Sequence, residues 1–574
     1  MQYTGARILI EALIEQGVDM VFGYPGGAVL NIYDELYKQR DRIRHILVSH
    51  EQHAAHAADG YARSTGRPGV CIATSGPGAT NLITGIATAY MDSSPVVAIT
   101  GNVTLPLLGK DSFQEVDISG ISMPVVKHNW IVKDLNDLAE IIREAFVVAQ
   151  SGRPGPVLID IPKDLTAGTA EYKVFLEAPA SALGGRARRL AERNERRTFT
   201  EADIGRAVSL LSLAKRPMLY AGGGVIISGA HAELTALAER LRAPAALSLM
   251  GIGAMSQEHP LCTGMIGMHG TVASNKAVQR TDLLVVIGAR FSDRVTSRPD
   301  TFARNARILQ IDIDPAEINK NIPTHDHISG DIKTVLAEIL KRLPARETSG
   351  WNGDIEQWKT RVPRANHRDT ALHPRFVIQE TARRLGEEAI VVTDVGQHQM
   401  WTAQFYPVNR PRGFLSSGGL GTMGFGLGAA LGAALGAPRA GNPGRPVVLF
   451  TGDGSFRMNC GELGTLVHYR APVLIIIINN GVLGMVRQWQ NLFYEERYAE
   501  TSLDRPPDFV KLAEAYGLAG YRAGDEASFT AALDRALGDI AAGGPALIEA
   551  RIDQNEMVLP MVPGGKPIDE MILS

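Results

Sequence analysis

Short runs of β-branched and other apolar residues alternate with amphipathic helical stretches along almost the whole chain. Ten such runs are predicted to be strands: 45–49, 69–74, 95–100, 156–161, 282–287, 307–313, 389–393, 446–451, 473–478 and 545–550. Continuous apolar strands separated by helices are typical of parallel sheets that helices cover on both faces. The pattern therefore predicts an α/β protein built from doubly wound parallel sheets.

Two polar stretches interrupt this rhythm. Residues 184–198 begin with two glycines and hold six arginines, and residues 341–373 are rich in polar residues, proline and glycine. We interpret both as linkers between domains. The 574 residues then form three α/β domains, within the three or four expected at roughly 100–200 residues each. These domains are residues 1–183, 199–340 and 374–574.

Charge and cysteine content exclude several classes of protein. The net charge is −3, from 58 basic and 61 acidic residues, which argues against a large surface for nucleic acid or membranes. The arginine run is diluted by Glu192 and Glu195 and lacks aromatic residues, so we expect a solvated helix. Three widely spaced cysteines indicate a reducing compartment. With no signal peptide or apolar span of ~20 residues, a cytoplasmic protein is expected.

The sharpest chemical signal follows two consecutive strands of the third domain. Gly452-Asp453-Gly454-Ser455 comes after strand 446–451, and Asn479-Asn480-Gly481 comes after strand 473–478. Parallel sheets bind ligands at the carboxyl ends of their strands. Oxygen ligands from Asp453 and Asn480 suit Mg²⁺ or Ca²⁺, and the glycines let a phosphate approach the backbone. A G-D-G followed 27 residues later (480 − 453) by N-N is the thiamine diphosphate signature.

Thiamine diphosphate chemistry requires one more residue. The cofactor's own aminopyrimidine acts as a base only when a carboxylic acid lies beside the pyrimidine ring. The first domain offers such an acid, because strand 45–49 is followed by His50-Glu51-Gln52 at the start of a helix over 53–63. A lone glutamate there is usually a partner of the helix dipole. Together with the third-domain motif, however, Glu51 is predicted to be catalytic.

Nine further motifs connect the chain to a known family. They lie at residues 23–28, 74–81, 111–115, 152–156, 161–164, 394–401, 418–424, 484–490 and 559–562. On these motifs the whole chain resembles the catalytic large subunits of the acetohydroxyacid synthase family, also called acetolactate synthases. The resemblance implies a thiamine diphosphate-binding fold with a central, Rossmann-like FAD-binding domain.

The resemblance also implies a reaction and partners. Such an enzyme decarboxylates pyruvate on thiamine diphosphate and transfers the two-carbon unit to a second pyruvate or to 2-ketobutyrate. The products, 2-acetolactate and 2-aceto-2-hydroxybutyrate, lead to branched-chain amino acids. The implied assembly is a homodimer or homotetramer with active sites between subunits, joined by a small regulatory subunit.

Site residues follow from the matching positions. Thiamine diphosphate would be held by Glu51, Gly396, Gln397, His398, Gly421, Met423, Gly454, Ser455 and Met485, and Mg²⁺ by Asp453, Asn480 and the carbonyl of Val482. FAD would be held by Arg153, Gly222, Gly223, His269, Gly270, Gly288, Arg290, Asp312 and Asp331. The second ketoacid would lie near Phe113, Gln114, Lys163, Arg294 and Trp489.

Some positions depart from the family's pattern. His53 stands where a small residue is common, Gly428 replaces a proline and Asn102 replaces a glutamine. None of them removes a residue that the chemistry requires. His50, His53 and His56 could suggest a metal site, but their spacing spreads them around a helix and no fourth ligand is evident.

Two other functions remain open at this point. The first is a related thiamine enzyme, either pyruvate oxidase or the flavin-free catabolic acetolactate synthase. The flavin-segment matches and Trp489 argue against the flavin-free type. The second is a non-catalytic scaffold or regulator with the thiamine fold, which would be expected to lack Glu51 or Asp453; this chain has both.

Overall fold

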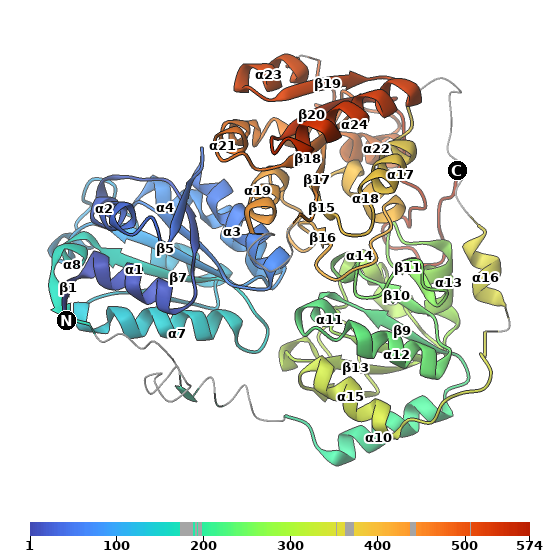
Figure 1. Cartoon of the computed structure of the whole chain (residues 1–574). Coiled ribbons are helices and arrows are strands. Elements are labelled where there is room, and N and C mark those ends of the chain that lie inside the picture. Colours follow the sequence, from blue (N-terminus) through green and yellow to red (C-terminus); the bar gives the residue numbers. More distant parts are fainter. Residues whose placement is uncertain are drawn as a thin grey trace.

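The computed structural model describes residues 1–172, 188–189, 192, 198–351, 353–361, 372–436, 444–504 and 507–574. Most of the first predicted linker and residues 362–371 of the second lie outside these residues. The described chain forms three six-stranded sheets, and every strand pairing within them is parallel. The three sheets are well separated in Figure 1. The predicted α/β class with parallel sheets is therefore confirmed.

The N-terminal sheet has the order β3-β2-β4-β5-β7-β6. Its strands are β2 (Met20–Gly23), β3 (Arg44–Leu47), β4 (Gly69–Ala73), β5 (Val96–Asn102), β6 (His128–Ile131) and β7 (Val157–Pro162). Apolar residues of α1 (Gly5–Glu15) and α7 (Leu138–Gln150) cover one face. Those of α3 (Glu51–Thr65) and α5 (Ile83–Met91) cover the other.

The C-terminal sheet repeats this arrangement, with the order β16-β15-β17-β18-β20-β19. Its strands are β15 (Ile390–Thr393), β16 (Phe414–Leu415), β17 (Val447–Gly452), β18 (Val473–Asn479), β19 (Ala519–Ala523) and β20 (Ala546–Arg551). Numbered along the chain, both sheets read 2-1-3-4-6-5. In each, the first strand lies between the second and third, so ligand-binding loops are expected at that switch point.

The central sheet has a different order, β11-β10-β9-β12-β13-β14. Its strands are β9 (Pro217–Ala221), β10 (Ala245–Leu247), β11 (Cys262–Met265), β12 (Leu283–Ile287), β13 (Arg307–Asp312) and β14 (Asp326–Ser329). Numbered along the chain this is 3-2-1-4-5-6, the Rossmann order. The switch point lies between β9 and β12.

A helix crossing joins the N-terminal and C-terminal domains. Helix α3 packs against α19 (Gly426–Gly436), and their side chains belong to one continuous core. Glycines line the crossing: a Cβ at Gly60 would overlap the backbone of Ala429, and one at Gly432 would overlap the backbone oxygen of Ala57. A Cβ at Gly428 would lie 2.9 Å from the Cβ of His56. The small residues therefore let the two backbones approach closely.

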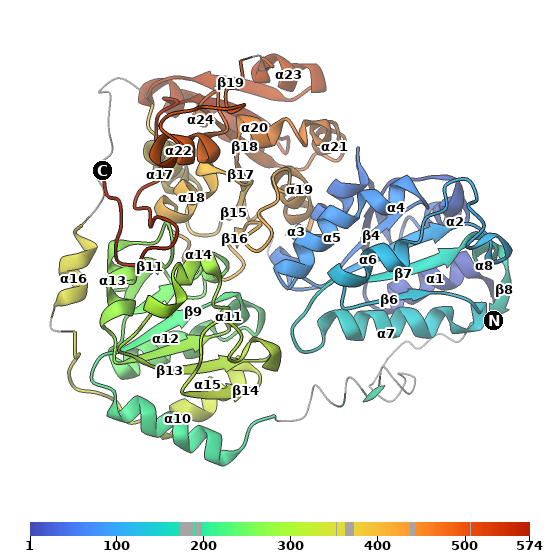
Figure 2. The ribbon, with the colours of Figure 1, turned by 180° about the vertical axis from the view of Figure 1, so that it is seen from behind.

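The C-terminal segment returns to the central domain. Figure 2 shows it running from the red C-terminal domain down along the green central one. Val562 and Ile568 are buried in the central core together with Trp351 and with Trp358 of α16 (Asp354–Lys359). Trp351 and residues 353–359, which the sequence places in a linker, thus lie against the central domain.

All ten predicted strands coincide with strands of the structure to within two residues at each end. The strands without a sequence prediction include β10, β14 and β16, which are two to four residues long. Among the described residues, no helix combines the length and the apolar character needed to cross a membrane.

Candidate active site

Asp453 lies where β17 meets α20 (Asp453–Phe456), directly beside the end of β18. Its side chain is only 2% exposed. Burial raises the pKa of Asp453 to about 6, although backbone N–H groups at both strand ends, including those of Asn480 and Gly481, act to lower it. The Oδ2 atom is buried and has no hydrogen-bond partner among the described residues. A buried carboxylate oxygen left free in this way suits a hard divalent cation.

The loop after β18 brings further oxygen atoms to Asp453. The Oδ1 atom of Asn480 accepts the backbone N–H of Val482 at 3.2 Å, and its Nδ2 donates to Oε1 of Gln397 at 3.0 Å. Gln397 in turn donates to Gln488 on α22 (Gly484–Phe493) and to the Glu556 carbonyl. These bonds occupy the side-chain amide of Gln397. The group that Gln397 can offer to an anion is therefore its backbone N–H, at the start of α18 (Gln397–Phe405).

His398 provides a second unsatisfied atom. It is buried, and burial lowers the pKa of His398 to about 3, so the imidazole is neutral. In the part of the chain that the structure describes, its Nε2 atom has no hydrogen-bond partner. Glycines make room for the ring: a Cβ at Gly396 would lie 2.7 Å from it, and one at Gly452 would lie 2.8 Å from Nδ1. His398 and the α18 N-terminus thus offer a polar cradle for phosphate oxygens.

The other predicted cofactor residues surround this cradle. Ser455 donates to the Val395 carbonyl at 3.0 Å, which joins the loops after β15 and β17. A Cβ at Gly454 would lie 3.9 Å from the terminal methyl of Met423, so Met423 lies against this loop. Gly421 has a φ of +71°, and Met485 packs on the C-terminal core from α22. The structure therefore brings the predicted C-terminal cofactor residues to one edge of the sheet.

Glu51 occupies the corresponding edge of the N-terminal sheet. It is buried at the start of α3, and its Oε2 accepts Nδ2 of Asn81 at 2.9 Å. Its Oε1 would lie 3.1 Å from a Cβ at Gly78. In the described part of the chain, every side-chain hydrogen bond of Glu51 is made within the N-terminal domain. Glu51 is therefore not joined to the Asp453 site of its own chain.

The central domain forms a second glycine-lined edge, at its switch point. The N–H of Gly222 donates to the Ile287 carbonyl, and that of Gly224 donates to Gly288. Gly288 has a φ of +55°, which favours glycine, and a Cβ at Gly223 would lie 3.3 Å from Met250. Such a close approach of two loops after adjacent parallel strands is what a dinucleotide site requires.

Comparison with known proteins decides the family. Three models of thiamine pyrophosphate enzymes match: the N-terminal TPP binding domain over residues 3–121, the central domain over 204–339 and the C-terminal TPP binding domain over 394–550. The acetolactate synthase large subunit of Parasynechococcus marenigrum is 47% identical, over 99% of this chain and 91% of that protein. The large subunit of acetolactate synthase isozyme 2 of Escherichia coli is 45% identical, over 99% of both chains. A probable acetolactate synthase large subunit of Methanococcus aeolicus is 44% identical, over 99% of this chain.

The chain belongs to the acetolactate synthase large-subunit family. The resemblance seen in the sequence motifs is thereby confirmed, and so is the thiamine enzyme fold. The Asp453 edge lies within residues 394–550, which the C-terminal TPP binding domain model matches. The free atoms of Asp453 and His398 fit the metal ion and the diphosphate, respectively.

The residues expected near the second ketoacid of an acetolactate synthase are mostly exposed. The side chain of Arg294 is 67% exposed, Phe113 is 88% exposed and Lys163 also faces solvent. Gln114 has a φ of +57°, and its backbone lies against Gly76. Trp489 on α22 packs on Phe493 with ring centroids 5.2 Å apart. Among the described residues these side chains come from all three domains and do not form one cluster.

Several of the remaining flavin candidates have structural partners. Arg153 donates to Glu317 at 2.9 Å and so links the N-terminal and central domains. His269 is buried, and burial lowers its pKa to about 4. Burial raises the pKa of Asp312 to about 6. Asp331 accepts the Thr334 N–H and so caps α15 (Ile332–Arg342). The N–H of Gly270 donates to the Gly267 carbonyl and closes a turn. Arg290 has no ion-pair partner within the described ranges.

Sequence reasoning assigned no role to Asp394, which organises the loops at the Asp453 edge. It is fully buried, and its two oxygens accept the N–H groups of Val395, Gly424 and Gly426 and the side chain of Asn459. Burial raises its pKa despite these donors. Asp394 thus ties the loop after β15 to the loop that carries Met423. The signal in the sequence was an acidic residue directly after a buried strand.

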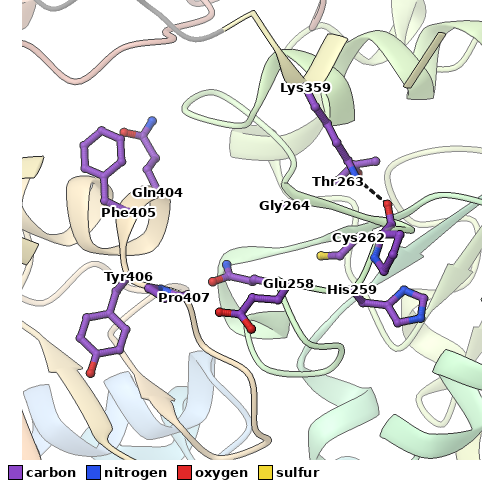
Figure 3. A pocket seen from close by; sticks show the side chains of 12 residues that line it. Glu258, His259, Cys262, Thr263, Gly264, Lys359, Gln404, Phe405, Tyr406 and Pro407 are labelled. Atoms are coloured by element: carbon purple, nitrogen blue, oxygen red, sulfur yellow. Dashed lines mark hydrogen bonds between the residues drawn. The ribbon is translucent and has the colours of Figure 1, made fainter. Parts of the chain in front are cut away.

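A pocket of about 310 Å³ lies between the central and C-terminal domains. Figure 3 shows residues 257–264 facing residues 404–407 across it, with Lys359 donating to the Pro260 carbonyl. No predicted site residue lines this pocket. Within the described residues, no three His, Cys, Asp or Glu side chains group as metal ligands.

Proposed function

We propose that the site at the ends of β15, β17 and β18 holds thiamine diphosphate and Mg²⁺ for acetolactate formation. The observation that carries this proposal is the free, buried Oδ2 of Asp453 beside Asn480. Asp453, Asn480 and the Val482 carbonyl would hold Mg²⁺. The backbone at Gly396 and Gln397 and the His398 ring would hold the diphosphate. Thiamine diphosphate supplies the carbon nucleophile that decarboxylates a 2-ketoacid.

Glu51 is proposed as the acid of this site. A carboxyl at the carboxyl end of a strand, buried and held by Asn81, is positioned to share its proton with the pyrimidine nitrogen of the cofactor. Because the Glu51 carboxylate bonds, among the described residues, only within its own N-terminal domain, we propose that it serves the Asp453 site of a partner chain. The enzyme would then be a homodimer or a homotetramer of such dimers.

The substrates are proposed to be pyruvate and a second 2-ketoacid, either pyruvate or 2-ketobutyrate. Lys163 and Arg294 are exposed cations that could bind a substrate carboxylate once a second chain closes the site. Phe113, Gln114 and Trp489 would form the rest of the acceptor pocket. These side chains orient the acceptor and exclude water from the transfer step.

FAD is proposed for the switch point of the central domain. The Gly222–Gly224 and Gly288 loops, the Rossmann strand order and Arg290, which has no ion-pair partner among the described residues, support this site. Because the net reaction transfers no electrons, the flavin would act as a structural group. A small regulatory subunit and a cytoplasmic location are also proposed; the three free cysteines fit a reducing compartment.

The test is to incubate the purified chain with pyruvate, thiamine diphosphate, Mg²⁺ and FAD, and to measure acetolactate and peroxide. Acetolactate is expected without stoichiometric peroxide, and omission of thiamine diphosphate or Mg²⁺ abolishes it. Peroxide in place of acetolactate would identify a pyruvate oxidase. Cofactor binding without any turnover of pyruvate would identify a non-catalytic member of the fold.

A further inference from the structure

The turn that carries Glu51 is held by the C-terminal domain of the same chain. Glu462 ends the 3₁₀ helix η10 (Cys460–Glu462), nine residues after the metal ligand Asp453 (462 − 453), and its side chain is fully buried. Its Oε1 accepts the backbone N–H groups of Ser49 at 2.8 Å and His50 at 3.2 Å. These are the last two residues before Glu51, so one carboxylate oxygen fixes the backbone from which the Glu51 side chain projects.

His53 completes the same arrangement from inside α3. Its Nδ1 lies 2.9 Å from Oε1 of Glu462, and both side chains are buried. Because Oε1 already accepts two N–H groups, Nδ1 of His53 carries the proton of this bond. The other oxygen of Glu462 accepts the hydroxyl of Thr465 at 2.7 Å. Both oxygens are therefore satisfied, as a buried carboxylate requires.

Neighbouring contacts show that this is one side of a larger junction. Ser49 Oγ donates to the Gly461 carbonyl at 2.9 Å, and the Leu47 N–H donates to the hydroxyl of Tyr469 at 2.8 Å. Among the described C-terminal side chains of this junction, Glu462 alone bonds the two residues that immediately precede Glu51 and the first turn of α3. The Tyr469 bond lies further from Glu51, on β3.

We propose that Glu462, with His53, is a positioning residue that sets the place of the Glu51 carboxyl. It acts through the Ser49–His50 backbone and the first turn of α3, and it contacts neither cofactor nor substrate. The inference rests on the proposed role of Glu51 as the acid of the thiamine site. Glu462 follows Asp453 on the same segment. It therefore also connects the proposed metal-binding loop of one chain to the Glu51 side chain of that same chain.

The first test compares Glu462→Ala, Glu462→Gln and the control Tyr469→Phe, which removes a nearby interdomain bond but leaves the turn intact. In cofactor-free protein, hydrogen–deuterium exchange of a peptide spanning residues 45–56 should speed up in Glu462→Ala. Turnover should fall by up to ~100-fold, the scale of an ångström-sized misplacement, while thiamine diphosphate affinity stays within about twofold. Glu462→Gln, which keeps an acceptor oxygen, should recover most of the turnover, and Tyr469→Phe should match the wild type.

A double-mutant cycle separates positioning from general stability. On a Glu51→Gln background, Glu462→Ala and the milder His53→Ala should lower the residual turnover no further. Multiplicative losses in this cycle, or a loss of cofactor affinity equal to the loss of turnover, would overturn the inference. If Glu51→Gln alone keeps wild-type turnover, it is the proposed function of Glu51 that fails. His53→Ala keeps the test decisive should Glu462→Ala not fold.

Discussion

Asp453 and Asn480 follow the neighbouring strands β17 and β18, and the backbone N–H of Asn480 acts to lower the pKa of the Asp453 carboxyl. This proximity brings the two halves of the thiamine diphosphate motif together, while among the described residues Oδ2 of Asp453 has no hydrogen-bond partner. Asp453→Asn should weaken Mg²⁺-dependent binding of thiamine diphosphate by at least ~100-fold, since even outer partners of metal sites contribute about 10- to 100-fold. Titration calorimetry checks this, with exposed Asp504→Asn as the control. Unchanged affinity would remove Asp453 from the metal site.

The proposed sharing of each site between two chains predicts that two inactive variants restore activity when they are combined. Neither Glu51→Gln chains nor Asp453→Asn chains alone should form acetolactate at an appreciable rate. When the two are unfolded and refolded together, or expressed together, mixed dimers contain one site with both natural residues. About a quarter of the wild-type activity should return, because half of the dimers are mixed and half of their sites are intact. If no activity returns, each site is built from a single chain.

The glycine-lined crossing of α3 and α19 predicts that the stability of the protein depends strongly on side-chain size at these positions. Gly432→Ala places a methyl group into the backbone of Ala57 and should destabilise the protein by about 1–3 kcal/mol. Gly205→Ala is the matched control, because that glycine lies on exposed α10 (Glu201–Leu213) with no atom within 4 Å of the new Cβ. It should be neutral or stabilise by up to ~1 kcal/mol. Thermal unfolding of both variants tests the packing; equal melting temperatures would contradict it.

The buried carboxyl of Asp160 should make the stability of the protein depend on pH. Burial raises the pKa of Asp160 to about 6, although Thr100 and Asn102 donate to its carboxylate. The folded state therefore binds more protons than the unfolded state between about pH 4 and pH 6, and this group's contribution to stability increases as the pH falls through that window. Above pH 6 the buried charge costs about 3 kcal/mol, at ~1.4 kcal/mol per pKa unit.

Asp160→Asn should consequently raise the unfolding temperature at pH 8, and the gain should vanish near pH 4. Calorimetry at the two pH values measures the difference. Asp41→Asn, at an exposed position, serves as the control with no pH-dependent gain. A constant effect of Asp160→Asn at both pH values would show that Asp160 is not neutralised in this range.

The long buried strands and the thiamine motif could be predicted because their signals are local. β17 and β18 read as continuous apolar runs, and Asp453 and Asn480 follow them directly. The two-residue β16 has too few residues to show a pattern. The roles of Asp394 and Glu462 depend on backbone groups that are distant in the sequence: Glu462 bonds Ser49, which lies 413 residues earlier. No periodicity or local motif marks such contacts.

The candidate acceptor residues illustrate a second limit. Phe113, Lys163 and Arg294 were named by resemblance, and in the single chain their side chains lie exposed. Their interpretation depends on a second chain. His53 was noted as a departure from the family, and the structure gives it a partner in Glu462.

The turnover of Glu51→Gln tests the account most directly. Wild-type and variant protein are compared in acetolactate formation from pyruvate, with thiamine diphosphate binding measured in parallel. We expect turnover to fall by at least ~100-fold, the usual scale for a lost proton-transfer group, while the cofactor still binds at the Asp453 site. Turnover close to that of the wild type, with the cofactor bound, would contradict the assignment of Glu51 as the acid of this enzyme.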